Sequence, residues 1–276
     1  MRSTSEVTYI SPAAGSKFSF SELWLYRELF YFFAWRDIKV RYKQTAIGAG
    51  WAILQPLIAT IIFSIIFNRI VGIESHGVPY PVFAFVGLMY WFLFSSGMNS
   101  ISNSLISNQG VITKIYFPRL IPPFSAAFVA VIDFFFSGVV FIGLLAFFKV
   151  VPNLVLGSVA ALGALLLMVT FTLGLGTFLA AVNVKYRDVK AALPFLIQIM
   201  MYASPIIYPI ELIPEQYRLW AYLNPAAGAV SMVRAGLFGA EFDFWGILLS
   251  IVVSIALLVF AVWYFKRSEK GMADII

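Results

Sequence analysis

Long runs of apolar residues divide the chain into segments that are long enough to cross a lipid bilayer. About 20 apolar residues are needed to cross roughly 30 Å of hydrocarbon. The first such run lies between Lys43 and Arg69, where no Asp, Glu, Lys or Arg occurs. By the same measure of length and hydropathy, we expect six membrane-spanning helices, at residues 50–69, 80–99, 124–148, 154–182, 191–209 and 244–265.

The segment before the first span has the pattern of a helix that lies in a membrane interface. Its apolar side chains recur at offsets of four, three and four, so they share one helical face: Tyr31, Trp35, Ile38 and Tyr42. A neighbouring face carries cations, namely Arg36, Lys39 and Lys43. Such a helix keeps its rings among acyl chains and its charges among phosphates. We therefore expect a loosely ordered start (residues 1–20), an interfacial amphipathic helix (21–47) and a transmembrane domain (48–276), with a hinge at Gly48 and Gly50.

Residues 210–243, between the fifth and sixth expected spans, are too polar to form another span. Their sequence predicts two short helical stretches, broken at Asn224 and Pro225. An ordinary outer loop and a pair of re-entrant helices both fit, because non-helical backbone is tolerated at membrane depth where protein or water covers it. The predicted fold class is an all-α integral membrane protein. It has six transmembrane helices, an N-terminal amphipathic interfacial helix and a broken helical element between spans five and six.

Composition and charge agree with a membrane protein. The chain is 61% hydrophobic and 12% charged, whereas soluble proteins carry about 25% charged residues. Its net charge of +6 sits at the ends of apolar segments, as topology signals do, so we predict contact with membrane lipids and not with nucleic acid. With both termini in the cytoplasm, the inner segments hold 15 of the 19 Lys and Arg residues, and this orientation follows from the positive-inside rule.

Few residues offer catalytic or metal-binding chemistry. The chain has no cysteine and a single histidine, His76, so neither a thiolate nucleophile nor a multi-histidine metal site is expected. Asp133 lies within the third span, where an acid is costly. It could serve as a proton or cation site, or as a hydrogen-bonded structural acid. We favour the structural acid, because no second acid and no intramembrane base accompanies it along the span.

Several motifs occur in one order along residues 25–265 and carry a family resemblance. They are RDIKVRYKQTAIGAGWAILQP at 36–56, K-x-x-F-P-R at 114–119, VNVKYRDV at 182–189, SPIIYP at 204–209 and NP at 224–225. This order resembles the type-2 ABC exporter permeases that move polysaccharides and teichoic acids. The chain has no G-x-x-x-x-G-K-[ST] phosphate loop, so energy from ATP would have to come through a partner.

The resemblance implies roles for particular residues. A gate for a lipid head group would use Arg36, Lys39, Arg41 and Lys43. Loops that couple to the ATPase would use Lys114, Phe117, Pro118, Arg119, Tyr186, Arg187 and Asp188. An external gate would involve Asn224 and Pro225. Because sugars stack on aromatic faces, the channel-lining candidates are Trp51, Gln55, Tyr90, Trp91 and Tyr202.

The resemblance also implies the assembly and its cargo. We expect a homodimer with two copies of a nucleotide-binding ATPase subunit, which binds the ATP and Mg, so this chain needs no cofactor and is not itself an enzyme. The predicted function is export of a lipid-linked polysaccharide, of O-antigen, capsule or teichoic acid type, across the bacterial cytoplasmic membrane. Its substrate would be an undecaprenyl-pyrophosphate-linked glycan or a similar molecule.

Three alternatives stay open. The first is a type-2 ABC permease for a drug or a small lipid. The second is a membrane-bound transferase acting on polyprenyl phosphate, which would need convergent acids at an interface. The third is a channel or secondary transporter, which would need intramembrane charge pairs or half-helices in repeats.

Overall fold

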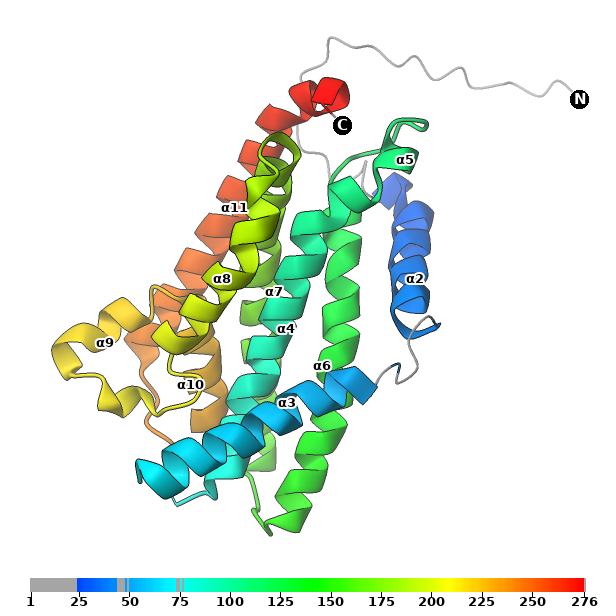
Figure 1. Cartoon of the computed structure of the whole chain (residues 1–276). Coiled ribbons are helices and arrows are strands. Elements are labelled where there is room, and N and C mark those ends of the chain that lie inside the picture. The colour runs from blue at the N-terminus through cyan, green and yellow to red at the C-terminus, as the bar shows by residue number, and fades with distance from the viewer. Residues whose placement is uncertain (1–23, 44–47, 49, 73–74, 76, 276) are drawn as a thin grey trace, which may run out of the picture.

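The protein is a bundle of long helices (Figure 1). A computed structural model describes the chain except for residues 1–23, 44–47, 49, 73–74, 76 and 276, and the described part contains helices without strands. This confirms the predicted all-helical fold class. The helices are α2 (Arg27–Lys43), α3 (Gly50–Phe63), η1 (Ser64–Ile70), α4 (Tyr80–Ser107), α5 (Gln109–Ile112), α6 (Ile121–Phe147), α7 (Leu154–Lys185), α8 (Asp188–Ala203), η2 (Ile210–Leu212), α9 (Glu215–Ala221), α10 (Pro225–Phe238) and α11 (Phe244–Ile275).

In the part of the chain that the structure describes, five helical segments are long and apolar enough to cross a membrane. They are Gly50–Ile70, Tyr80–Ser107, Ile121–Phe147, Leu154–Lys185 and Phe244–Glu269. The expected fifth span differs, because α8 has 16 residues and ends at Ala203. Ser204 has an extended backbone, with φ −100° and ψ 147°, as is typical of a residue that precedes a proline. The count of six expected spans is thus not reproduced by length and hydropathy.

The helix α4 forms the centre of the bundle and packs against α3, α6, α7, α8 and α10. Its aromatic side chains stack on those of its neighbours. The rings of Phe94 and Phe171 lie 4.8 Å apart and nearly parallel, and those of Tyr90 and Phe134 meet at 4.8 Å, edge to face. Such pairs add about 0.5–1.5 kcal/mol beyond the area that they bury. The core of the molecule therefore lies along α4.

The same helix is longer than the span predicted at 80–99, because its polar C-terminal half is also helical. The amide of Asn103 donates to the carbonyl of Asn99 at 2.8 Å, and the hydroxyl of Ser107 donates to the carbonyl of Asn103 at 2.9 Å. These bonds run to the residue four positions earlier, so the side chains are satisfied without interrupting the helix.

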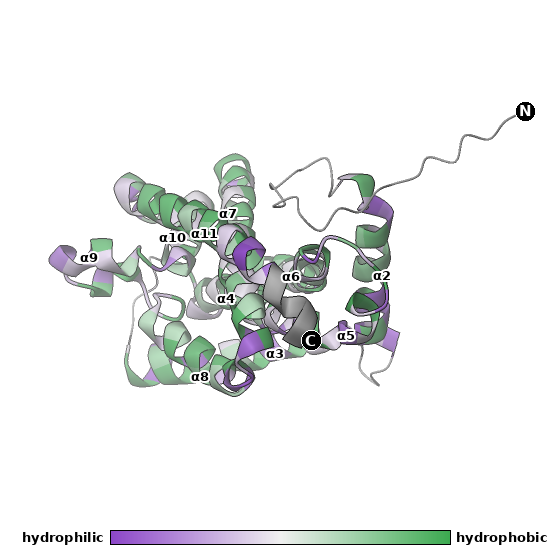
Figure 2. Ribbon diagram, turned by 90° about the horizontal axis from the view of Figure 1, so that it is seen from above, coloured by the Kyte–Doolittle hydropathy of each residue, from purple (hydrophilic) through white to green (hydrophobic). Residues whose placement is uncertain are grey.

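The helix α2, which precedes the first span, lies beside α6. Figure 1 shows α2 running alongside the first half of α6, while α3 crosses the bundle obliquely. Seen from above, α2 lies at one edge of the bundle and α9 at the opposite edge (Figure 2). The rings of Tyr31 and Trp35 are exposed and stacked at 6.3 Å, whereas Tyr42 of the same predicted face meets Phe136 of α6 at 5.9 Å. The position of α2 relative to a lipid interface stays a prediction.

The helices α7 and α10 approach so closely that they depend on a glycine. A Cβ atom on Gly236 would lie 2.3 Å from the Cβ of Ala160. We expect Gly236→Ala to lower the free energy of unfolding by about 1–2 kcal/mol, since overpacking outweighs the gain in helix propensity. Thermal unfolding of the detergent-solubilised protein measures this. Gly143→Ala is the matched control, because a Cβ there meets no atom within 4 Å, and an equal loss in both variants would contradict the packing argument.

Candidate functional site

An ion pair joins the end of α2 to the middle of α6. The guanidinium of Arg41 pairs with the carboxylate of Asp133, and the hydroxyl of Tyr42 donates to the other carboxylate oxygen at 2.6 Å. The side chain of Asp133 is 10% exposed and that of Arg41 is 38% exposed. Burial, followed by the hydrogen bond to Asp133, raises the pKa of Tyr42, so the phenol keeps its proton and stays a donor.

This pair corrects an expectation from the sequence. We expected no base near Asp133, but Arg41 reaches it from a helix about 90 residues earlier in the chain. The sequence places Arg41 and Tyr42 side by side in the basic segment and Asp133 alone in a span. Nothing in that pattern says that α2 packs along α6, so the contact could not be found from spacing.

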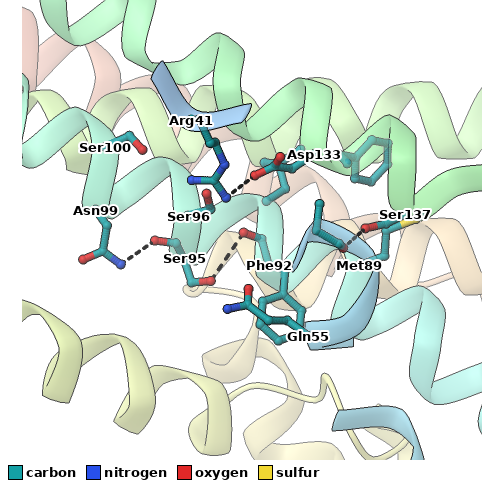
Figure 3. Close-up of a pocket in the computed structure, with 13 residues that line it drawn as sticks. Arg41, Gln55, Met89, Phe92, Ser95, Ser96, Asn99, Ser100, Asp133 and Ser137 are labelled. Carbon is teal, nitrogen blue, oxygen red and sulfur yellow. Dashed lines mark hydrogen bonds and ion pairs between the residues drawn. The ribbon is translucent and has the colours of Figure 1, made fainter. Parts of the chain in front are cut away.

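The ion pair borders a polar cavity of about 330 Å³ (Figure 3). Its other polar walls come from Gln55 of α3, Ser137 of α6 and, on α4, Ser95, Ser96, Asn99 and Ser100. A second hollow of about 390 Å³ lies next to it, and the two share Arg41 and Ser100. The second hollow is also lined by Arg36 and Asp37 from α2 and by Ser104, Ser107 and Asn108 from α4. A row of hydroxyl and amide groups thus follows α4 past the end of α2.

The four predicted head-group residues have different surroundings. Arg41 faces the first cavity. Arg36 faces the second, where it pairs with Asp37 at 2.6 Å and lies over the Phe33 ring at 4.7 Å. Lys39 is exposed and lies over the Trp35 ring at 5.3 Å. Lys43 is exposed.

The predicted ATPase-coupling loops lie at the same end of the bundle, beyond α5 and at the junction of α7 and α8 (Figure 1). Their exposed members are Lys114, Tyr186, Arg187 and Asp188, and Pro118 is half-buried. Phe117 is buried and its ring lies 5.6 Å from that of Phe33 in α2. Arg119 donates to the carbonyl of Glu269 at 2.8 Å, which ties its loop to α11. The first loop is therefore in direct contact with α2.

The five channel-lining candidates divide into two groups. Trp51 and Tyr202 are about half exposed, and Gln55 lines the cavity. Tyr90 and Trp91 are buried in the core of a single subunit, and the hydroxyl of Tyr90 donates to the carbonyl of Ala161 at 2.8 Å. Their burial argues against a channel-lining position. An aromatic-rich stretch marks core and channel alike, so the sequence did not separate the two.

The segment around the predicted external gate is held together by hydrogen bonds. Asn224 caps α10, since its side-chain oxygen accepts from the amide of Ala226 at 3.1 Å, and its side-chain nitrogen donates to the hydroxyl of Ser204 at 2.5 Å. Pro225 is the first residue of the helix, where its missing N–H costs nothing. The pair therefore links α10 to the turn that follows α8.

A buried arginine, which the sequence did not reveal as special, supports the same turn. Arg234 of α10 donates to the carbonyls of Pro205, Ile206 and Tyr208 and to that of Phe83 in α4, at 2.5–3.3 Å. Burial lowers the pKa of Arg234 to about 9, so it remains a cation at neutral pH. The SPIIYP motif is thus a turn whose carbonyls surround one guanidinium.

Comparison with known proteins matches the chain to one family and to named transporters. The family model for the ABC-2 type transporter matches residues 28–238. The O-antigen export system permease protein RfbA of Klebsiella pneumoniae is 28% identical over 244 residues, 87% of this chain and 92% of that protein. Its namesake from Myxococcus xanthus is 27% identical over 261 residues, 92% and 98% of the two chains. The polysialic acid transport protein KpsM of Escherichia coli is 27% identical over 209 residues, 72% and 77% of the two chains.

Proposed function

The chain belongs to the ABC-2 type transporter family, and we propose that it is the membrane-spanning permease subunit of an ATP-driven polysaccharide exporter. The observation that carries this is the similarity, over most of both chains, to permeases named for O-antigen export and to a polysialic acid transporter. Five helices in the described part of the chain are long and apolar enough to cross a membrane, in keeping with a membrane-spanning subunit. Among these relatives the cargo is named as a glycan, which favours a glycan over a drug.

Within this proposal, the ATPase is a separate subunit that binds ATP and Mg. Two copies would bind a homodimer of this chain on the surface formed by Lys114, Tyr186, Arg187 and Asp188. These side chains are exposed on two loops at one end of the bundle. The positive-inside rule puts that end in the cytoplasm. The buried contact between Phe117 and Phe33 gives ATPase movement a path to α2.

The basic helix α2 would receive the lipid-linked diphosphate. Arg and Lys form charge-assisted hydrogen bonds with phosphate oxygens, and juxtamembrane cations attract anionic lipids. Arg36 and Arg41 line adjacent hollows, while Lys39 and Lys43 are exposed on the same helix. The hydroxyls and amides along α4 offer uncharged hydrogen-bond partners for sugars. A head group would then enter at α2, with its glycan along α4.

The test neutralises the four cations Arg36, Lys39, Arg41 and Lys43 to glutamine. Polysaccharide export is expected to fall at least about tenfold, because several charge-assisted contacts of about 1.5–3 kcal/mol each are lost. The measurement is surface polysaccharide in a host that lacks its own permease, together with co-purification of the ATPase subunit. Co-purification should survive, since the predicted docking loops are untouched.

The matched control removes Arg69 and Lys149, exposed cations outside α2, and should export normally. Unchanged export in the fourfold variant would exclude the head-group role. A chain that purifies without an ATPase subunit and conducts ions would contradict the exporter itself.

A further inference from the structure

The helix α2 is fastened to the rest of the protein near both of its ends, by different chemistry. Towards its N-terminus the attachment is apolar, because Phe33 is buried against Phe117 and the Phe30 ring lies 5.5 Å from that of Phe128. At its C-terminus Arg41 and Tyr42 bind the carboxylate of Asp133, and the Tyr42 ring also meets that of Phe136 at 5.9 Å. The polar end is the one that borders the cavity.

A phosphate can replace the carboxylate in the polar attachment, whereas it has no partner in the apolar attachment. A guanidinium binds a carboxylate and a phosphate with the same fork of N–H donors. Among the described residues that line the cavity, Arg41 and Asp133 are the charged pair, and the others are apolar side chains or hydroxyls and amides. A phosphate entering this space therefore meets one cation, which the carboxylate of Asp133 already occupies.

We propose that Asp133 is a positioning residue for transport, which latches the C-terminal end of α2 to α6 until a phosphate in the cavity replaces its carboxylate on Arg41. The phosphate is that of the lipid-linked substrate, so this part rests on the proposed function. After the exchange the hydrogen bond from the Tyr42 hydroxyl still joins α2 to Asp133, so the attachment is weakened and the carboxylate keeps a donor. Arg41 gains an anion in place of the one that it loses.

The latch predicts how fast backbone amides of residues 36–43 exchange with deuterium in the purified transporter with its ATPase subunit. Removing one partner of a buried ion pair leaves the other without compensation. Arg41 is more than a third exposed, which reduces this effect. We expect Asp133→Asn to speed exchange in this segment about tenfold, and Tyr42→Phe, which keeps the ion pair, to speed it by about threefold. The reversed pair, Arg41→Asp with Asp133→Arg, should restore protection.

Asp37→Asn is the matched control. Asp37 pairs with Arg36, its neighbour on the same helix, so this change removes an equal charge without cutting a link between helices. Its exchange should stay within about twofold of wild type. Amides of α10 serve as an internal reference, because a global loss of stability would speed their exchange as well.

The phosphate step is tested with nanodiscs of phosphatidylcholine, with or without phosphatidic acid. In the wild type, phosphatidic acid should speed exchange in residues 36–43. In Asp133→Asn, phosphatidic acid should not speed the exchange of these residues further. If phosphatidic acid does not change the rate of deuterium exchange in the wild type, replacement of the Asp133 carboxylate by a phosphate is excluded. If neither Asp133→Asn nor Tyr42→Phe changes that rate, the latch itself is excluded. Either result leaves the proposed function standing if the fourfold cation variant still loses export.

Discussion

Arg234→Leu is expected to lower the free energy of unfolding by about 3–5 kcal/mol and to leave little folded permease. The guanidinium donates to four backbone carbonyls, three of them in the non-helical turn at 204–209. Leucine would leave the three carbonyls of the turn without this donor, and each such loss costs about 1–3 kcal/mol. Part of this cost is recovered when the turn relaxes. Thermal unfolding and the yield of monodisperse protein in detergent measure the effect.

Arg218→Leu provides the matched control for that change. Arg218 also donates to backbone carbonyls, those of Ile213 and Glu211, but its side chain is 24% exposed and water can replace it. We expect a loss of about 1 kcal/mol or less. Arg234→Lys should fall between the two, because an ammonium cannot span the same set of carbonyls. If Arg234→Leu were as stable as wild type, the turn would not depend on the guanidinium.

Replacing Arg187 and Asp188 together with alanine is expected to weaken binding of the ATPase subunit by tenfold or more and to abolish most export. Both side chains are exposed at the junction of α7 and α8 and take no part in the core. Truncating central interface residues costs about 1–2 kcal/mol each, which for two residues corresponds to roughly 30- to 900-fold in affinity. Co-purified ATPase and substrate-dependent ATP hydrolysis are the measurements.

Lys190→Ala serves as the control in the same short segment. Lys190 is exposed two residues after Asp188 but is outside the predicted docking set, so its removal should change ATPase binding by less than about threefold. Thermal unfolding of both variants should match wild type. Full export by the Arg187 and Asp188 double variant would show that this loop does not couple to the ATPase.

The sequence predicted the spans whose hydropathy is uninterrupted and was less accurate where local chemistry intervenes. Apolar runs located all five helices that are long enough to cross a membrane. The expected span at 191–209 continued past Pro205 to Pro209, but the extended backbone of Ser204 ends α8 just before the first of these prolines. Conversely, the predicted α4 was too short. Its last residues are polar, but their side chains form hydrogen bonds to carbonyls of their own helix and so do not interrupt it.

The candidate site was predictable in its parts and not in its assembly. Charge and periodicity identified α2 and placed Arg36 and Arg41 on it, and both line the polar hollows. The link from Arg41 to Asp133 depends on how α2 packs along α6, and no local pattern encodes that. The surroundings of Arg234 depend likewise on three separate segments meeting around one side chain.

The internal hydrogen bonds of α4 determine which of its neighbours can separate from it. Since Asn99, Asn103 and Ser107 are satisfied by their own helix, water can wet that face, or a partner can slide along it, without stranding a donor. The bond from the Asn183 amide to the carbonyl of Ser102 instead joins α4 to α7. We therefore expect α4 and α7 to stay together while α2 moves beside them.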